Sequence, residues 1–183
     1  MNIWKKLAVT AALPAICFMT GCTGVPDGVE VVTGFDLNRY LGTWYEIARL
    51  DHRFERGMSS VTANYSLRED GGVAVVNRGY KNATGEWEEA TGKAYFIGNP
   101  DVGRLKVSFF GPFYGAYNII ALDKVDYQYA MIAGPNRDYL WILARSPTLD
   151  NDVVSDLVDK AGKWKFPADE LIFVDHSATN SPD

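Results

Sequence analysis

The stretch of sequence that decides the fold runs from residue 38 to residue 49 and reads NRYLGTWYEIAR. Its second half and the residue after it, from Trp44 to Leu50, are rich in aromatic and aliphatic side chains and predict a β-strand. Side chains alternate between the two faces of a strand, so we expect Glu46 on the face of Trp44, where a buried carboxyl group needs a partner. A nearby Arg or Tyr could satisfy Glu46, or a bulge could free it, and the sequence leaves both outcomes open.

Seven more extended segments follow this one at short, regular spacing, separated by turn residues. The clearest is Ser60–Arg68, in which Val61, Ala63, Tyr65 and Leu67 alternate with polar side chains. The others are Val73–Lys81, Trp87–Ile97, Leu105–Phe110, Tyr114–Leu122, Tyr127–Ala133 and Tyr139–Ala144. Eight strands in this order predict an all-β fold, an eight-stranded antiparallel up-and-down β-barrel that either packs solid or holds one small ligand.

The periodicity changes from that of strands to that of a helix after the eighth strand. Apolar side chains recur at helical spacing at Val153, Val154, Leu157, Val158, Ala161 and Trp164. Thr148 and Asp150 are the candidate N-caps, and Pro167 ends the helix. Leu171–Val174 predicts a short closing strand. We therefore expect one C-terminal α-helix packed outside the barrel, followed by that strand.

The first 21 residues have the features of an export signal. Lys5 and Lys6 give a positive start, and an apolar run from Leu7 to Met19 follows, too short for a stable membrane span. The run ends in Met19-Thr20-Gly21-Cys22, which resembles the bacterial lipobox. That resemblance implies that Cys22 becomes the first residue of the mature protein and carries diacylglycerol and an amide-linked acyl chain. A plain secretory signal with an incidental cysteine is the alternative.

Several acyl chains on Cys22 would anchor the protein firmly, where one chain would be marginal. By the sorting rule of this lipoprotein class, Thr23 directs the protein to the outer membrane, and we expect it at the periplasmic face. The only other cysteine, Cys17, lies in the signal, so the mature domain is expected to have no disulfide. The chain then divides into a signal peptide (1–21), a tether from lipidated Cys22 (22–33), the barrel with its helix (34–176) and a polar tail (177–183).

Composition and charge narrow the class of partner. The 183 residues suffice for one domain with a hydrophobic core, and the 13% aromatic content favours strands around a ring-lined interior. The formal net charge is −5, and it becomes −7 when Lys5 and Lys6 leave with the signal. Such a surface disfavours nucleic acid, because phosphate binding depends on basic side chains.

Three motifs in this order resemble the lipocalin family, and most closely its bacterial outer-membrane lipoprotein branch. Residues 38–49 match the family's Gly-x-Trp signature through Gly42 and Trp44. Asp126-Tyr127 matches part of the Thr-Asp-Tyr signature, with Val125 in place of Thr, and Arg145 ends the eighth strand. The resemblance implies that Arg145 lies over Trp44 and closes the barrel at its base. These signature residues, Gly42, Trp44, Asp126, Tyr127 and Arg145, are therefore expected to be structural. The segments that point to the bacterial branch are Tyr40–Arg56 and Lys106–Tyr117.

Strand parity predicts which side chains line the barrel interior. The face of each strand without Lys or Arg gives Ala63, Tyr65, Val75, Asn77, Ala94, Phe96, Val107, Phe109, Tyr139 and Trp141. Tyr117 and Met131 are added from segments that are apolar on both faces. Small side chains among wide rings predict an apolar, partly filled ligand cavity, with a packed core as the alternative. The aromatic tip Phe109–Tyr114 could contact a membrane or a partner, or line the rim of the pocket.

The resemblance to lipocalins implies binding and storage or transport of lipids, such as fatty acids or lysophospholipids, at the bacterial outer membrane. A structural envelope lipoprotein with a solid barrel is one alternative, and a lipocalin enzyme is another. Against catalysis, the chain has two histidines, His52 and His176, and no Gly-x-Ser-x-Gly motif, metal-spaced cluster or phosphate loop. We expect no catalytic residue, no cofactor and no metal. The sequence leaves open whether the chain forms a homodimer.

Overall fold

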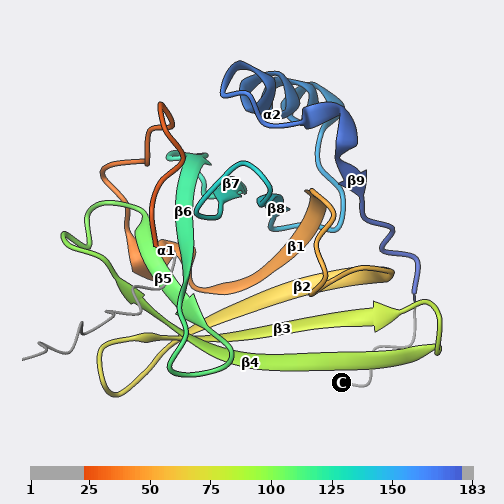
Figure 1. Ribbon diagram of the computed structural model, residues 1–183, viewed down its shortest axis with the longest axis horizontal. Helices are drawn as coiled ribbons and strands as arrows, with labels where there is room; N and C mark the ends of the chain where they lie inside the picture. The colour runs from red at the N-terminus through yellow and green to blue at the C-terminus, as the bar shows by residue number, and fades with distance from the viewer. Residues whose placement is uncertain (1–22, 179–183) are drawn as a thin grey trace, which may run out of the picture.

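Eight antiparallel strands close into a barrel in the computed structural model, which describes residues 23–178 (Figure 1). The strands are β1 (Gly42–Arg49), β2 (Met58–Leu67), β3 (Val73–Lys81), β4 (Glu86–Phe96), β5 (Arg104–Ser108), β6 (Gly115–Leu122), β7 (Tyr129–Ala133) and β8 (Leu140–Ala144). Each strand pairs with the next, and β8 pairs with β1 to close the barrel. The predicted signal peptide and Cys22 lie outside the described residues.

The strands begin and end within two residues of the predicted limits, and the differences have local causes. β7 begins at Tyr129 because Tyr127 has a φ of 57° and belongs to the preceding turn. β5 ends at Ser108, since Phe109 and the residues after it form the β5–β6 connection. A one-turn helix, α1 (Leu37–Tyr40), precedes β1 and was not predicted.

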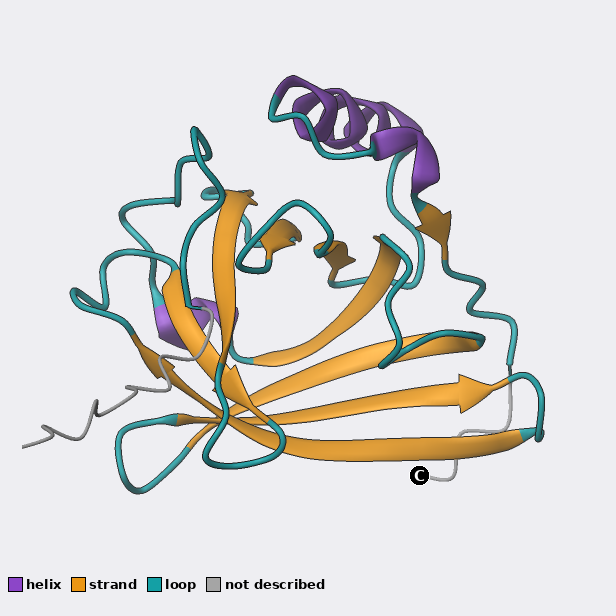
Figure 2. Ribbon diagram, in the orientation of Figure 1, coloured by secondary structure: helices purple, strands orange, loops and turns teal. Residues whose placement is uncertain are grey.

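The C-terminal helix α2 (Asn151–Lys163) lies outside the barrel, as Figure 2 shows, and Asp150 caps it by accepting a hydrogen bond from the Asp152 amide. Leu157 and Ala161 are buried against the outer face of the barrel. A short 3-10 helix, η1 (Ala168–Glu170), leads to the closing strand β9 (Ile172–Phe173), which pairs with the end of β1.

Met131 faces α2 and not the barrel interior, so the prediction that it lines the cavity is wrong. It pairs with Ile142, and both side chains belong to the apolar cluster between the barrel and the helix. Its neighbours Ala130 and Ile132 point inward instead. Because α2 covers this wall, β7 is apolar on both faces, and polarity could not reveal which face is inside.

The connections between strands gather at two ends of the barrel. One end, which we call the closed end, holds α1 and the β6–β7 connection. The opposite end, which we call the far end, holds the β1–β2, β5–β6 and β7–β8 connections, because alternate turns of an up-and-down meander lie at the same end. None of the helices within residues 23–178 has the length and apolar character needed to cross a membrane.

The segment expected to be a tether packs against the barrel wall. The carbonyl oxygen of Gly24 accepts a hydrogen bond from the Asn118 side chain (2.9 Å), and that of Thr23 accepts one from Arg104 (3.3 Å). Pro26 and Val29 are buried. Residues 23–29 are therefore part of the folded domain.

Candidate functional site: the barrel interior

Trp44 closes the base of the barrel. Its side chain is fully buried, and its indole N–H donates to the Tyr40 carbonyl oxygen (2.8 Å). The Arg145 guanidinium lies over the ring, 3.9 Å from its centroid, and donates to the carbonyl oxygens of Arg39 (2.7 Å) and Thr43 (2.9 Å). Gly42 has a φ of 92°, in the left-handed region that favours glycine. These four contacts join α1, β1 and the end of β8 into one floor.

Tyr127 is buried at the closed end, but the carboxylate that organises this turn is Asp123 and not Asp126. The Tyr127 hydroxyl accepts a hydrogen bond from the Asp36 amide (2.9 Å), and the Arg39 guanidinium lies 4.2 Å from the ring centroid. Asp123 accepts hydrogen bonds from the amides of residues 125, 126 and 128, whereas the Asp126 side chain is exposed. The Thr-Asp-Tyr signature has its acid directly before the tyrosine, so the match pointed to Asp126 and missed Asp123.

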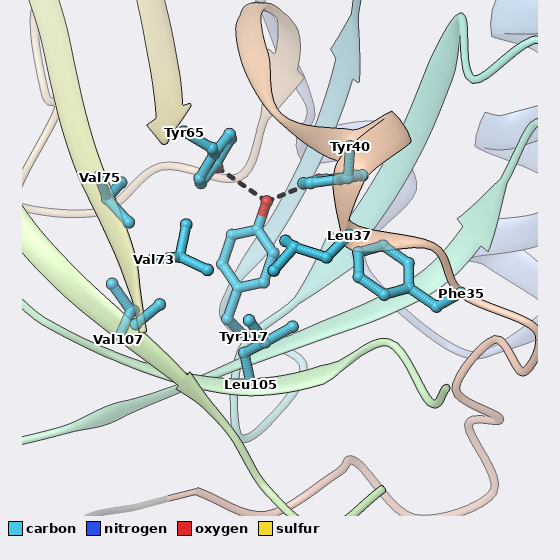
Figure 3. A pocket seen from close by; sticks show the side chains of 10 residues that line it. Phe35, Leu37, Tyr40, Tyr65, Val73, Val75, Leu105, Val107 and Tyr117 are labelled. Carbon is cyan, nitrogen blue, oxygen red and sulfur yellow. Dashed lines mark hydrogen bonds between the residues drawn. The ribbon is translucent and has the colours of Figure 1, made fainter. Parts of the chain in front are cut away.

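Above this floor lies a small apolar pocket, shown from close by in Figure 3. Five of the predicted interior residues line it: Tyr65, Val75, Ala94, Val107 and Tyr117. Five more were missed: Phe35, Leu37, Tyr40, Val73 and Leu105. Parity could have found Val73 and Leu105, which lie two residues from Val75 and Val107. No strand pattern predicts the other three residues, because Leu37 and Tyr40 belong to α1 and Phe35 to the segment before it. The enclosed volume is about 10 Å³, the room of one water molecule.

A chain of three tyrosine hydroxyls is the only polar feature among the residues that line this pocket. The Tyr117 hydroxyl lies between those of Tyr40 (2.7 Å) and Tyr65 (2.8 Å), as the dashed lines in Figure 3 mark. Burial raises the pKa of all three phenols, so they remain neutral and act only as hydrogen-bonding groups. The pocket therefore offers hydroxyl groups within an apolar wall and no charge.

The other predicted interior residues lie around this pocket. Ala63, Phe96, Phe109 and Trp141 belong to the same interior cluster. Phe109 lies over Gly92, where a Cβ atom would come within 2.8 Å of the ring, so glycine makes room for it. Asn77 pairs with Ala63, and its buried Oδ1 atom has no hydrogen-bond partner. Tyr139 stacks on Trp141 with ring centroids 6.2 Å apart.

A buried polar cluster lies on the same interior side of β1, further toward the far end. A bulge after Glu46 shifts the register of β1 against β8, so that Glu46 and Arg49 both point inward. The Arg49 guanidinium donates to the Glu46 carboxyl group (2.6 Å) and to the backbone oxygens of Glu55 and Met58. Both outcomes left open for Glu46 thus occur together: an arginine partner and a bulge.

Glu55 completes the polar cluster from the β1–β2 connection. Its carboxylate accepts the Trp141 indole N–H (3.0 Å) and lies 3.1 Å from the His52 ring nitrogen. Burial, reinforced by the nearby charge of Glu55, raises the pKa of Glu46 well above its ordinary value. Burial alone would raise the pKa of Glu55 too, but its hydrogen bonds with His52 and Trp141 outweigh burial and lower that pKa. We therefore assign the negative charge to Glu55 and the proton to Glu46, which leaves one anion beside the Arg49 cation.

Within residues 23–178, no group of three or more His, Cys, Asp and Glu side chains is arranged to hold a metal ion. His52 faces Glu55, and His176 forms a 2.8 Å hydrogen bond with the backbone oxygen of Glu46. The chemistry that the described interior can supply is therefore apolar contact, hydroxyl hydrogen bonds and one compensated charge pair.

Comparisons with known proteins place this architecture in a family. The sequence-family model described as a lipocalin-like domain matches residues 35–176. The chain is 52% identical over 172 residues to outer membrane lipoprotein Blc of Escherichia coli K12, covering 93% of this chain and 97% of that protein. It is 51% identical over 156 residues to outer membrane lipoprotein Blc of Vibrio cholerae, covering 85% and 91%.

A more distant relative and a solved structure are also similar to this chain. Apolipoprotein D of Bos taurus is 36% identical over 135 residues, which cover 70% of each chain. The structure of insecticyanin from the tobacco hornworm Manduca sexta superposes with a TM-score of 0.66 at 24% identity, covering 85% of this chain and 88% of that one. The family model covers most of the chain and the relatives are more than 30% identical over most of it, so the chain belongs to the lipocalin family.

Proposed function

We propose that the barrel interior accepts the acyl chain of a fatty acid or lysophospholipid, and that the protein stores or carries this lipid while anchored through Cys22. The general function follows from its relatives: the chain is an outer-membrane lipocalin that binds and transports small apolar ligands. The proposed lipid and the anchor at Cys22 go beyond this. We expect ligand binding and no catalytic turnover.

The polarity gradient inside the barrel is the observation that supports an amphipathic ligand. The side chains that line the pocket above Trp44 are apolar except for the tyrosine hydroxyls. Glu46 and Arg49 lie further along β1 toward the far end, and Glu55 joins them from the β1–β2 connection. An acyl tail would lose contact with water beside the apolar wall, at about 0.8 kcal/mol per CH₂ group. A polar head would then lie at the level of the charged cluster or beyond it.

The small volume of the pocket sets a condition on this proposal. A space of about 10 Å³ holds no acyl chain, so side chains must move when the ligand enters. Val107 and Phe109 are only partly buried and belong to β5 and the connection after it. We expect these side chains to give way, while Trp44 and the floor stay in place.

A charge on the pocket wall tests the proposal. Val107→Asp places a carboxylate in the pocket, where it must stay hydrated or find a partner. We expect fatty-acid affinity to fall at least tenfold, about 1.4 kcal/mol, in a titration followed by tryptophan fluorescence, while circular dichroism still shows a folded barrel. Mass spectrometry of the native protein should also detect a co-purifying lipid.

The matched control is Ser66→Asp, because Ser66 is exposed on the outer face of β2 next to Tyr65. Ser108, which strand parity suggests instead, is less suitable: it lies on the outer face but is buried, and its hydroxyl has no partner. Equal loss of binding in both variants would contradict the wall assignment. If the wild type binds no lipid in either assay, the carrier function is wrong and the protein is a structural lipoprotein with a solid barrel.

A further inference from the structure

The strands β1 and β2 pair directly over only part of their length. The paired segments are Gly42–Tyr45 of β1 and Thr62–Tyr65 of β2. β1 continues beyond them to Arg49 and β2 begins before them at Met58, and the described backbone shows no pairing between these two ends. The barrel wall therefore has a gap in its hydrogen bonding, which we call the β1–β2 gap, between the paired segments and the far end.

Both strands are irregular where this gap begins. A bulge after Glu46 interrupts the register of β1 against β8, and a second bulge between Ser59 and Thr62 interrupts that of β2 against β3. Ser60, inside the second bulge, has a φ of 49°, a conformation that is strained for a residue with a side chain. Because a bulge bends its strand, two bulges at one level explain why β1 and β2 separate here.

Residues 172–176, which we call the strap, fill the β1–β2 gap. β8 occupies one edge of β1, so β9, the first part of the strap, pairs with the end of β1 at the edge that faces β2. The Val174 amide then donates to the Ile47 carbonyl oxygen (3.0 Å), and the Ser60 amide of β2 donates to the Asp175 carbonyl oxygen (2.7 Å). Figure 1 shows the chain after β9 running past the ends of β1 and β2. The strap is thus bonded to both strands where they are not bonded to each other.

The attachment of the strap is slight compared with that of the barrel strands. None of its five residues is buried, and its two large apolar side chains, Ile172 and Phe173, are 40% and 59% exposed. Its last residue, His176, is held by a hydrogen bond to the Glu46 carbonyl oxygen (2.8 Å) and by an edge contact with the Tyr45 ring. Segments with few buried apolar contacts and solvent-exposed backbone hydrogen bonds open at a lower free-energy cost than core strands.

The charged cluster lies directly behind the β1–β2 gap. The Arg49 guanidinium spans the gap from inside, because it donates to the Glu46 carboxyl group of β1 and to the Met58 carbonyl oxygen of β2 (3.0 Å). Glu46 and Arg49 are only 3% and 2% exposed. A lipid that enters here would have its polar head beside Arg49 and its acyl chain directed toward the apolar pocket.

We propose that the strap is a side gate, whose release opens the β1–β2 gap and lets a fatty acid or lysophospholipid enter the barrel between these two strands. The inference rests on the proposed lipid-binding function. The segments Gly42–Tyr45 and Thr62–Tyr65 stay paired when the strap is released, so Trp44 and the floor keep their places while the wall opens.

A looser strap should speed both entry and release of the ligand. Val174→Pro removes the amide that donates to Ile47, whereas the control Val174→Ala keeps this amide. Stopped-flow mixing in a fixed detergent concentration measures how fast the mature, lipidated protein binds undecanoic acid with a terminal dansyl group, and displacement by excess lauric acid measures its release. In Val174→Pro both rate constants should rise by at least about threefold relative to Val174→Ala, because the gate opens more often. Since no strap residue lines the pocket, the dissociation constant should change by less than about twofold.

A locked strap should have the opposite effect. The Ser60 hydroxyl points to the Asp175 carbonyl oxygen (3.4 Å), so the double variant Ser60→Cys and Asp175→Cys should join the strap to β2 by a disulfide. Residues 23–178 contain no other cysteine. Oxidation should lower both rate constants by at least about fivefold, and reduction should restore them. The matched control is Thr43→Cys with Asn64→Cys, whose side chains are in contact (2.9 Å) where β1 and β2 already pair, so oxidation there should leave both rates unchanged.

Two kinetic results would overturn the side gate. Rate constants that neither the looser nor the locked strap changes would show that the lipid enters elsewhere. Faster release from Val174→Pro with unchanged association would show that the strap only stabilises the bound state and does not control entry.

Hydrogen exchange separates the gate from the carrier function, because it needs no ligand. The amides of Val174 and Ser60 should exchange at least about ten times faster than the Leu50 amide, which donates to the Leu140 carbonyl oxygen of β8 (3.0 Å). If the wild type binds no dansyl probe but shows this difference, the carrier function is wrong and the strap still opens. If the wild type binds the probe and the three amides exchange equally slowly, only the gate is wrong.

Discussion

At the scale of the residue, Arg145 shows how one side chain can hold a barrel closed. Its guanidinium lies over Trp44 and donates to three carbonyl oxygens, those of Arg39, Thr43 and Tyr127, and its backbone amide donates to the Gln128 carbonyl oxygen. The Gly-x-Trp motif and the arginine could be matched in the sequence because the motif is local and the arginine ends the last strand. The backbone partners could not be predicted, since they depend on how three distant segments meet.

Arg145→Ala should therefore lower the free energy of unfolding by about 2–4 kcal/mol, through the lost cation–π contact and the carbonyl oxygens left without a donor. Urea denaturation measures this loss. Arg145→Lys keeps the positive charge but loses the planar guanidinium, which donates to several oxygens at once, so it should recover only part of the stability. Fatty-acid affinity of the folded fraction should stay unchanged. A large loss of affinity without a loss of stability would place Arg145 in the binding site and contradict its structural role.

At the scale of the element, alternation located the strands well where one face is exposed and poorly where both are covered. Ser60–Arg68 has a polar outer face, and its inward residues Ala63 and Tyr65 lie in the interior cluster as parity predicts. Tyr127–Ala133 has no polar face because α2 packs over it, and parity placed Met131 on the wrong side. Which arginine pairs with Glu46 also escaped prediction, since the bulge in β1 brings Arg49 to the face of Glu46.

Met131→Ala tests this placement of Met131. The side chain is fully buried between the barrel and α2, so its loss should leave a cavity and cost about 2–4 kcal/mol of stability in thermal or urea unfolding. Because the cavity forms outside the barrel, the folded protein should bind fatty acid as before. Ser155→Ala, at an exposed position of α2, is the control and should change stability by less than about 0.5 kcal/mol. Weaker fatty-acid binding by Met131→Ala would show that Met131 lines the barrel interior and contradict its placement against α2.

At the scale of the whole molecule, the buried carboxyl groups link global stability to pH. Burial holds the pKa of Glu46 above its ordinary value of 4.5. Below pH 4.5 the group is protonated in both folded and unfolded states and contributes no slope. Between pH 4.5 and the raised folded pKa, only the unfolded chain releases the proton, so stability falls with rising pH by up to about 1.4 kcal/mol per pH unit. The contribution of Glu55 to the pH dependence of stability has the opposite sign, because its lowered pKa adds stability above pH 4.5 that is lost as pH falls.

Glu46→Gln should remove the fall in stability with rising pH that the raised pKa of Glu46 causes. The glutamine side chain is uncharged, and its oxygen can still accept the hydrogen bond from Arg49, so the variant should match the wild type near pH 4 and exceed it in stability at pH 7. Urea unfolding at several pH values measures the difference, and Glu89→Gln, at an exposed position of β4, should reproduce the wild-type pH dependence. If Glu46→Gln is instead less stable at pH 7 than at pH 4 relative to the wild type, Glu46 is ionised in the folded protein. The interior then holds an Arg49–Glu46 ion pair beside a second carboxylate, and an incoming fatty-acid carboxylate would meet a net negative cluster.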